Sequence, residues 1–584
     1  MCNMKRTLAL LIAAMLVLAM FAGCGNSAAS AAEAGSEATE ASSAGAAAAE
    51  AEETEEAAAP AEAEAPAASA AEPAEASAAE AEAEAAEDEN LVTNGLWTYH
   101  YTEISLPLTE EDLTLTLWTD FLPPLYSVMS GMEENSVYIE LTERTGVQLD
   151  ISSIAMSEAS TQASLVLASG DFPDIWLGFV NYYSGTIDSA VDDDIIYDLA
   201  DYKEYMPNYF SLIDENEELV KLTYSDTGVM SQTYGVFANP KSTQGLACRK
   251  DWLEALDLEV PETYDEFHDV LTAFKENYDA TYWMNADGEQ YFSMGYDVSY
   301  GFEVVDGVVE YGPVQEGFRD YLTMMNQWYE EGLIWHDFAT SEEAIDEGKA
   351  GLGEYGMYDC ALSKYTNIVG NATDENFSLQ GLVPAVQEEG QTLHLGNLNS
   401  YTGIKGFSLT TAIDEETLPI ACQWLDYWYT PDGSMLANYG VEGEAYNLVD
   451  GEVVYTDLML NNPDLNFTWA MNKYAMGSGS FIMDGDRIYN DYNDEQWELM
   501  DVFNSDFTDH AYTMPSVTMT VEESDIYTAT YNDIETYVEE HILTFINGDE
   551  SLDNFDSFVQ AIYDMGIEDC IAQEQSAYDR YMAR

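Results

Sequence analysis

The chain has 584 residues and carries 110 Asp and Glu against 17 Lys and Arg, which gives a formal net charge of −93. A surface this acidic repels nucleic acid and anionic lipid, and no local basic cluster is evident that would favour an anionic ligand. The 40 Tyr, 21 Phe and 11 Trp indicate a large core rather than general disorder.

The first 23 residues have the pattern of an export signal. Lys5 and Arg6 precede an apolar stretch from Leu8 to Ala22, which is shorter than the roughly 20 residues that span a membrane. The small residues before Cys24 resemble the lipobox of bacterial lipoproteins. We therefore expect residues 1–23 to be a signal peptide. Cys24 would then be lipidated and hold the protein on the extracellular face of the cytoplasmic membrane.

Residues 24–90 are almost entirely Ala, Glu, Ser, Gly and Pro, and contain no Lys or Arg. This composition offers no apolar face for packing, and Pro60, Pro66 and Pro73 interrupt any continuous helix. We interpret the segment as a disordered tether without a recognition role of its own.

Residues 91–584 are too many for one hydrophobic core, so two lobes are expected. At the start of this body, apolar alternation predicts strands at 113–117, 147–151 and 172–177, separated by helices at 133–145 and 157–168. This order predicts a parallel sheet with crossover helices, in which ligands bind beyond the carboxyl ends of the strands. Trp118 and Asp120 follow the first strand, and Asp174 and Trp176 lie at the end of the third.

The second half is richer in helices. Residues 246–252 indicate a strand that leads into a helix, and Thr263 with Glu266 forms a capping-box pattern after Pro261. The helix that this box opens carries Phe267, Val270, Leu271 and Phe274 at helical spacing, so that stripe should be core. Further helices are expected at 317–331, 415–429, 526–546, 552–565 and 568–582.

Motifs for catalysis and metal binding are missing from the sequence. It contains no H-E-x-x-H, G-x-S-x-G or Walker-type phosphate loop. Residues 283–294 have an EF-like Gly288, with Asn285 at position 3 and Asp287 at position 5. Trp283 and Met294 stand where positions 1 and 12 need oxygen ligands, so no metal or cofactor is expected. Cys248, Cys360, Cys422 and Cys570 fit no zinc spacing; free buried thiols are favoured, with one disulfide left open.

Five stretches, in order along the body, resemble the extracellular solute-binding lipoproteins of bacterial carbohydrate ABC importers, in the family that includes maltose-binding protein. They are ASGDFPDIWLG (168–178), LACRKDWLEALDLEVPETYDEFHDVLTAFKE (246–276), GFRDYLTMMNQWYEEGLIWHDFAT (317–340), ACQWLDYWYTPDGSMLANYGVEGEAY (421–446) and MGIEDCIAQEQSAYDRYM (565–582).

This resemblance implies two α/β lobes joined by a hinge, with the ligand in a cleft between them. By analogy, lobe 1 would hold about 113–240 and 403–447. Lobe 2 would hold about 246–400 and 450–584. The family context also favours a structural ion pair for Arg249 and Asp251 and a core position for Trp252.

Aromatic rings that stack on sugar faces, and polar groups that bond sugar hydroxyls, are the expected site residues. The resemblance points to strand ends, to loops near the cleft and to the lobe crossings, where a hinge role is an equally good interpretation. The candidate ligand-binding residues are Asp174, Trp176, Tyr234, Tyr355, Tyr358, Asp359, Tyr401, Glu442, Tyr446 and Trp469.

The favoured hypothesis is a monomeric, lipid-anchored binding protein that captures an oligosaccharide and delivers it to the permease subunits of an ABC transporter. Two alternatives remain open. The same fold could bind a peptide or a cationic solute, which the acidity favours. A glycoside hydrolase is the other, because a chain with 110 carboxylates always contains some pair that resembles a catalytic dyad.

Overall fold

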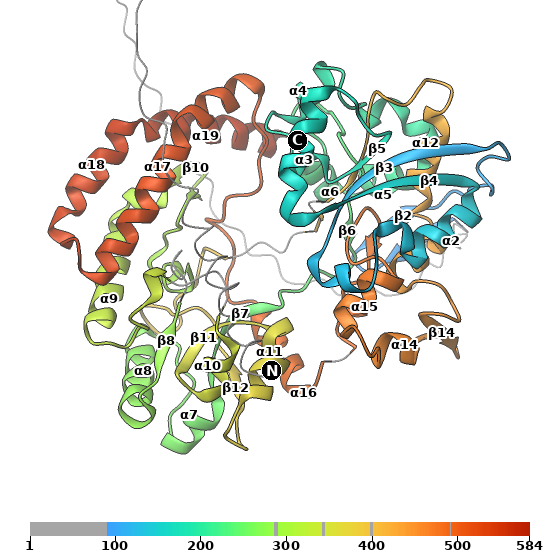
Figure 1. The fold of residues 1–584 in the computed structure, drawn as a ribbon. Coiled ribbons are helices and arrows are strands. Elements are labelled where there is room, and N and C mark those ends of the chain that lie inside the picture. Colours follow the sequence, from blue (N-terminus) through green and yellow to red (C-terminus); the bar gives the residue numbers. More distant parts are fainter. Residues whose placement is uncertain (1–89, 285–289, 341–344, 397–400, 404, 491) are drawn as a thin grey trace, which may run out of the picture. The chain divides into compact units, whose positions relative to one another are not determined.

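The computed structural model describes residues 90–584, apart from 285–289, 341–344, 397–400, 404 and 491. Cys24, the tether up to residue 89 and the EF-like residues Asn285, Asp287 and Gly288 lie outside the described residues. The described residues form two large hydrophobic cores, each packed on its own four-stranded sheet, and smaller clusters beside them. These cores define lobe 1 and lobe 2, as the sequence predicts (Figure 1).

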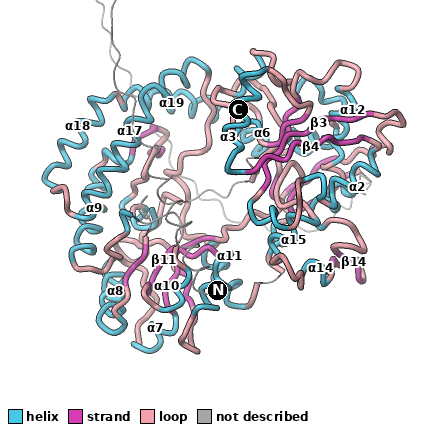
Figure 2. The backbone as a smooth tube through the Cα atoms, viewed as in Figure 1, coloured by secondary structure: helices cyan, strands magenta, loops and turns pink. Residues whose placement is uncertain are grey.

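The sheet of lobe 1 contains the predicted β-α-β-α-β unit. Its first strand is parallel to both of its neighbours, and the last strand joins antiparallel from a distant part of the chain. Figure 2 shows β3 and β4 side by side in this sheet. In spatial order the strands are β13 (Phe407–Leu409), β5 (Ile175–Leu177), β3 (Leu113–Phe121) and β4 (Val147–Ala155).

Local signals set the helices of this unit. The side chain of Asn135 accepts hydrogen bonds from the backbone N–H groups of Val137 and Tyr138, and so caps α2 (Ser136–Thr145). Gly146 ends α2 with a positive φ of 78°. The next crossover, α3 (Ala159–Ser169), ends at Gly170 in the same way.

The remaining early elements pack on this sheet and its core. Trp424 and Trp428 are fully buried and contact Phe407 of β13. Pro431, which follows the expected helix at 415–429, occupies the first turn of a further helix. These elements are β1 (Leu91–Asn94), β2 (Trp97–His100), α4 (Ile187–Asp192), α5 (Pro207–Asp214), α6 (Glu217–Thr223), α12 (Leu418–Tyr427) and α13 (Pro431–Tyr439).

The predicted start of lobe 2 at residue 450 is wrong. Tyr455 and Phe467 are buried in one cluster with Phe121 and Leu125 of lobe 1. Asn135 also donates its side-chain N–H groups to the carbonyls of Asn472 and Ala475, both at 3.0 Å. The apolar side chains of this segment are thus covered by lobe 1. The segment consists of β14 (Tyr446–Val449), β15 (Glu452–Tyr455), α14 (Asp457–Leu460) and α15 (Phe467–Tyr474).

The sheet of lobe 2 is mixed. Its second strand is antiparallel to both neighbours, and the last two strands are parallel. Arg249, at the end of the second strand, forms the expected structural ion pair with Asp251 at 2.6 Å, and Trp252 is in the core. In spatial order the strands are β12 (Leu379–Gly381), β7 (Gln244–Arg249), β11 (Tyr355–Ala361) and β8 (Thr281–Trp283).

The predicted capping box opens α8: Thr263 and Glu266 exchange side-chain and backbone hydrogen bonds, and the stripe from Phe267 to Phe274 is buried. A hairpin of β9 (Phe302–Val305) and β10 (Val308–Tyr311) also belongs to lobe 2. Its other helices before the C-terminal group are α7 (Lys250–Leu256), α8 (Tyr264–Tyr278), α9 (Glu316–Glu330), α10 (Glu347–Leu352), α11 (Leu362–Asn371) and α16 (Asp494–Phe503).

Three C-terminal helices complete lobe 2. They are α17 (Val521–Asn547), α18 (Phe555–Met565) and α19 (Ile567–Ala583), close to the predicted ranges. The first begins five residues earlier than expected, because Thr520 and Glu523 form a capping box there. Figure 1 shows these helices together beside α9, whose apolar face shares their core.

Among the described residues, the chain passes between the lobes in three crossing segments, which we define as 238–243, 401–406 without 404, and 484–493 without 491. The first and third follow β6 (Val236–Phe237) and β16 (Ile482–Met483), which pair in parallel. The second precedes β13. More than one crossing is what the resemblance implies.

Cys248, Cys360, Cys422 and Cys570 are free and buried in the structure, as favoured from the sequence. Within the described ranges, no helix has both the length and the apolarity needed to span a membrane.

Candidate functional site

A cavity of about 780 Å³ lies at the carboxyl edge of the parallel strands of lobe 1. Asp120 is the next-to-last residue of β3, Met156 follows β4, and Asn181 and Tyr182 come shortly after β5. This is the place where open parallel sheets bind ligands, because the loops that leave the strands diverge there. The cavity therefore lies at the edge of the sheet where the sequence predicts ligand binding.

The crossing segments form the rest of the wall. Residues of all three contribute, together with a small-residue stretch from Gly477 to Gly479. The cavity is therefore next to the part of the chain that any hinge motion must bend. Lining residues from these segments are Asn239, Pro240, Lys241, Thr402, Gly403, Lys405, Asp484, Gly485, Arg487, Ile488 and Tyr489.

Close backbone packing holds the crossings together beside the cavity. The N–H of Gly403 donates to the carbonyl of Gly235 at 2.8 Å. A Cβ atom added to Gly235 would lie 2.2 Å from the carbonyl oxygen of Gly479. Only glycine fits at position 235, because any side chain would collide with backbone that cannot turn away.

Asp120, Lys405 and Tyr182 form the central polar cluster of the cavity. The ammonium of Lys405 forms an ion pair with Oδ1 of Asp120, whose side chain is 4% exposed. The hydroxyl of Tyr182 donates to Oδ2 of the same carboxylate at 3.0 Å. Burial, followed by the charge of Asp120, raises the pKa of Tyr182 well above its ordinary value. Tyr182 therefore stays protonated and keeps donating to Asp120.

Aromatic rings support this cluster from behind. Trp118 of β3 contacts Tyr182 edge to face, with ring centroids 5.2 Å apart. Trp118 also packs on Trp176 of β5 at 4.9 Å. Such ring pairs fix orientation as well as burying area. The tryptophans therefore hold Tyr182 in place, and neither of them lines the cavity.

Two further cations line the cavity. Lys241 pairs with Asp486 at 2.6 Å. Arg487 is 4% exposed and donates to the carbonyls of Asn438 and Gly477, at 3.0 and 3.1 Å. Burial lowers the pKa of Arg487 to about 10, so it remains charged near neutral pH. With Lys405, three of the 17 Lys and Arg are gathered here, which corrects the expectation that no basic cluster exists.

Among the described residues that line this cavity, none is one of the ten candidates chosen from the sequence. Asp174 precedes β5 instead of ending it, so its predicted position is wrong. Its carboxylate accepts hydrogen bonds from the N–H and hydroxyl of Thr116, at 2.7 and 2.8 Å, and so joins β5 to β3. Trp176 is completely buried in the core of lobe 1.

The lobe 2 candidates are part of β11 and its core. Tyr355 is the first residue of the strand and packs against Trp283 and Trp335. Tyr358 is fully buried. Asp359 accepts a hydrogen bond from the side chain of Gln244 on the neighbouring strand. Burial raises the pKa of Asp359.

Tyr234 and Tyr401 lie close to the lobe crossings, as expected. The carbonyl of Tyr234 accepts a hydrogen bond from Tyr429 at 2.5 Å. Tyr401 packs edge to face on Trp97 at 5.5 Å, next to the cavity residue Thr402. Both tyrosines pack against the core of lobe 1, so the structure brings them near the site without placing them in its wall.

Glu442, Tyr446 and Trp469 belong to the segment that the structure reassigns to lobe 1. Glu442 is exposed. Tyr446 is 6% exposed and packs near Tyr439, and Trp469 is partly buried on the same cluster. None of these three residues lines the cavity.

The most informative residue missed from the sequence is Asp120. The pattern places it at the carboxyl end of the first parallel strand, which is the signal that could have selected it. Lys405 and Arg487 carry no such signal, because long-range folding brings them to the cavity.

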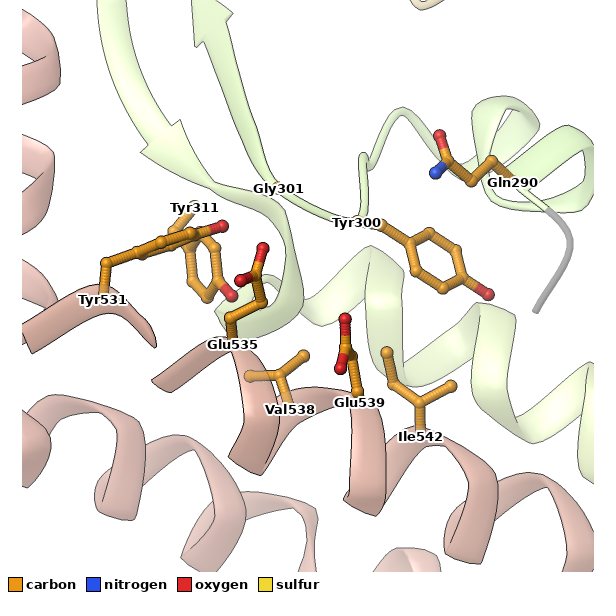
Figure 3. Close-up of a pocket in the computed structure, with 9 residues that line it drawn as sticks. All are labelled: Gln290, Tyr300, Gly301, Tyr311, Tyr531, Glu535, Val538, Glu539 and Ile542. Atoms are coloured by element: carbon orange, nitrogen blue, oxygen red, sulfur yellow. The ribbon is translucent and has the colours of Figure 1, made fainter. Parts of the chain in front are cut away.

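A smaller hollow of about 270 Å³ lies in lobe 2 between the β9–β10 hairpin and α17. Figure 3 shows Tyr311 and Tyr531 beside Glu535, with Glu539 further along the same helix. No cluster of three or more His, Cys, Asp or Glu suited to a metal occurs among the described residues. We assign this hollow no role.

The fold and cavity define a two-lobe solute-binding protein. The chain belongs to the bacterial extracellular solute-binding protein family, whose model matches residues 138–445. It is 24% identical to lipoprotein LipO of Bacillus subtilis over 367 residues, which is 59% of this chain and 70% of LipO.

A second relative spans more of the chain. The fructooligosaccharide ABC transporter substrate-binding protein FusA of Streptococcus pneumoniae is 24% identical over 524 residues, covering 83% of this chain and 93% of FusA. The solved structure of an extracellular solute-binding protein from Bifidobacterium longum subsp. infantis has a TM-score of 0.66 at 17% identity. It covers 80% of this chain and 98% of that one.

Proposed function

We propose that this protein captures an oligosaccharide outside the cell and delivers it to the permease of an ABC transporter without acting as an enzyme. The observation that carries the proposal is the cavity of about 780 Å³ at the carboxyl edge of the lobe 1 sheet. Ligand pockets commonly have volumes of roughly 300–1,000 Å³. The relative FusA is named for fructooligosaccharides, which supports this ligand class.

The walls of the cavity suit a sugar. Leu122, Met156, Phe237 and Ile488 offer apolar surface to ring faces. The polar cluster offers both hydrogen-bond donors and hydrogen-bond acceptors to the hydroxyl groups of a sugar. Lys405 has further N–H donors beyond its bond to Asp120, and the Tyr182 oxygen, which donates its proton to Asp120, retains lone pairs that accept.

The charges at the cavity argue against a cationic solute. Lys241, Lys405 and Arg487 line it, against only Asp120 and Asp484 among the described carboxylates. A cation would lose its hydration there and meet like charges. The acidity of the whole surface, which favours such a ligand in general, is therefore offset at the site by these three cations.

The same geometry argues against a glycoside hydrolase. Hydrolases of this kind need a carboxylate pair placed on both sides of the scissile bond. Both oxygens of Asp120 are already engaged, one by Lys405 and one by Tyr182. The ion pair with Lys405 weakens Asp120 as a nucleophile or base.

We further propose that residues 1–23 are removed as a signal peptide, that Cys24 carries the lipid, and that residues 24–90 tether the binding domain. The relative LipO is named a lipoprotein, which supports this proposal. A tether keeps the receptor concentrated near its permease and so favours repeated delivery.

A thermal-shift screen tests the ligand class. The panel should hold neutral oligosaccharides, acidic oligosaccharides, peptides and polyamines. A ligand at 100 times its Kd stabilises the folded state by about 2.7 kcal/mol. We expect an oligosaccharide to raise Tm and to remain uncleaved in the same sample. A shift only with peptides or polyamines, or turnover of the sugar, would contradict the proposal.

A further inference from the structure

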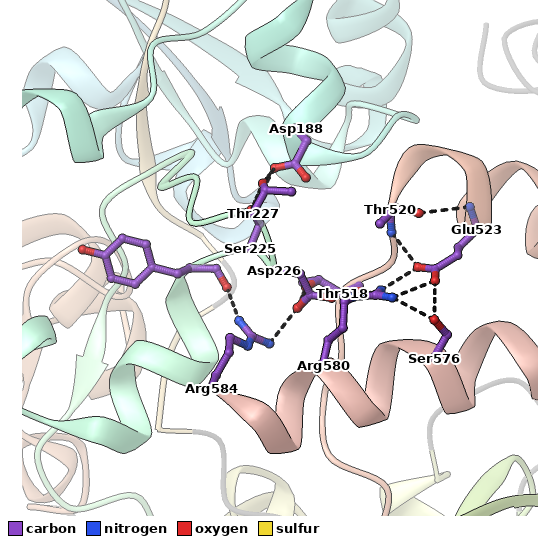
Figure 4. Close-up of polar contacts among 11 residues, drawn as sticks. Asp188, Ser225, Asp226, Thr227, Thr518, Thr520, Glu523, Ser576, Arg580 and Arg584 are labelled. Atoms are coloured by element: carbon purple, nitrogen blue, oxygen red, sulfur yellow. Dashed lines mark hydrogen bonds and ion pairs between the residues drawn. The ribbon is translucent and has the colours of Figure 1, made fainter.

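Asp226 of lobe 1 lies against two arginines of lobe 2 (Figure 4). Its Oδ2 is 2.5 Å from Nε of Arg580, and its Oδ1 is 3.0 Å from Nη2 of Arg584. The hydroxyl of Thr518 donates to Oδ1 at 2.8 Å. The Asp226 side chain is only 5% exposed, so water screens these contacts little.

Asp226 is firmly held by lobe 1. It lies in the turn that follows α6. Its neighbours Ser225 and Thr227 both donate to Oδ1 of Asp188 on α4, at 2.8 and 2.9 Å. The carbonyl of Tyr224, in the same turn, accepts a hydrogen bond from Nη1 of Arg584 at 2.8 Å. The turn therefore holds the Asp226 carboxylate and the Tyr224 carbonyl in place as acceptors for the arginines.

Arg580 is equally well held by lobe 2. Its Nη1 and Nη2 donate to the two carboxylate oxygens of Glu523, at 2.7 and 2.5 Å. Glu523 also closes the capping box of α17, and Ser576 donates to it at 2.7 Å. The bond with Arg580 is the main reason that the pKa of Glu523 falls to about 2. Arg580 is thus oriented before it meets Asp226.

This cluster links the two cores at a point remote in sequence from the crossing segments. Asp226 and Arg580 are 354 positions apart. Within the cluster, the negative charges of Asp226 and Glu523 offset the positive charges of the two arginines. Separation of the lobes at this point would break both ion pairs of Asp226 at once and return its carboxylate to water.

We propose that Asp226, Arg580 and Arg584 form an electrostatic brace that fixes the spacing of the two lobes before a ligand arrives. Two-lobe binding proteins move by hinge rotation. While the brace is intact, rotation of the lobes is restricted at a second point, which is remote in sequence from the crossing segments. The brace does not depend on which ligand the cavity takes, so its test is independent of the proposed function.

The test measures the distance between the lobes in the full-length, ligand-free chain by pulsed electron paramagnetic resonance. Spin labels are placed at Leu165→Cys on α3 and Leu352→Cys on α10, which are 59% and 58% exposed. Cys2 and Cys24 are replaced by serine, and the four cysteines of the described body are buried. We expect one narrow distance distribution in the parent protein.

Asp226→Asn keeps the shape of the side chain and removes its charge, and should broaden the distribution. Arg584→Gln removes the second guanidinium, which pairs with Asp226 at the longer distance of 3.0 Å, and should broaden it less. Asp214→Asn is the matched control, because it removes the carboxylate that pairs with Lys203 inside lobe 1, outside the cluster, and should leave the distribution narrow. Unchanged distributions in folded Asp226→Asn and Arg584→Gln, or equal broadening by Asp214→Asn, would overturn the brace.

Discussion

Lys405, on the second crossing segment, forms an ion pair with Asp120 at the end of β3, 285 positions earlier in the chain. The pair connects the segment that must bend during hinge motion to the rigid edge of the lobe 1 sheet. A ligand that bonds both Lys405 and Tyr182 would therefore contact the second crossing segment and the edge of the sheet together. We expect changes at this cluster to affect ligand binding.

Lys405→Met should weaken oligosaccharide binding. The variant keeps the length of the side chain and removes its charge and donors. A hydrogen bond to a charged group is worth about 1.5–3 kcal/mol, so we expect Kd to rise by about 10- to 100-fold. Isothermal titration with the best oligosaccharide of the screen measures this change.

The matched control is Lys203→Met. Lys203 pairs with Asp214 at 2.7 Å in lobe 1 and is 42% exposed, outside the cavity. Its Kd should equal that of the parent protein. Equal affinities for Lys405→Met and the parent would show that the ligand does not use this cluster.

Gly235→Ala should disturb the site through the backbone. The added Cβ would lie 2.2 Å from the carbonyl oxygen of Gly479, so β6 and β16 must move apart beside the cavity. Overpacking of this kind costs about 1–3 kcal/mol. We expect a lower Tm in differential scanning calorimetry and weaker ligand binding.

Gly370→Ala provides the opposite control. Gly370 is in α11, and a Cβ there meets no atom within 4 Å. Alanine in a helix is favoured over glycine by roughly 0.5–1 kcal/mol, so Tm should rise slightly. Equal Tm values for the two variants would show that the close approach at Gly235 does not affect stability.

Glu303 should make the protein more stable in mild acid than at neutral pH. Its side chain is 1% exposed, and burial raises its pKa to about 7 from an ordinary 4.5. Between these two values the folded state binds more protons than the unfolded state. Stability is therefore fully present below about pH 4.5 and is lost as pH rises towards 7, by up to about 3 kcal/mol from this group.

Urea unfolding of Glu303→Gln at several pH values measures this contribution. The variant should lose part of the decline in stability between pH 4.5 and 7. Glu498→Gln, at a side chain that is 68% exposed, should keep the full decline. Identical profiles for all three proteins would mean that Glu303 titrates normally.

Sequence periodicity predicts most of lobe 1's sheet and the helices of lobe 2, because strands such as 113–117 and the stripe from Phe267 to Phe274 show their buried faces directly. It also predicts the edge of the sheet that holds the cavity. It fails for the segment after residue 450, whose short elements show no preference for either core until Tyr455 and Phe467 meet Phe121.

The wall of the cavity is harder to predict, because it forms from three separate crossings. Aromatic residues such as Trp176 and Tyr358 are attractive sugar platforms by type, but their strands are buried on both faces, which places them in the core. A cation such as Arg487 has no local pattern that marks it as part of a site. Its surroundings depend on contacts with residues up to 50 positions away, including Ala437 and Gly477.

Cys24→Ser should release the protein from the membrane without changing ligand affinity. Lipidation requires the thiol, and serine keeps the size of the side chain while removing that chemistry. In the parent protein two acyl chains would anchor firmly, since each buried methylene contributes about 0.8 kcal/mol. Fractionation of cells followed by immunoblotting measures the change, and Cys2→Ser, inside the predicted signal peptide, is the matched control. Cys2→Ser should stay with the membrane fraction. Retention of Cys24→Ser there as well would mean that the uncleaved apolar stretch, and not a lipid on Cys24, holds the protein.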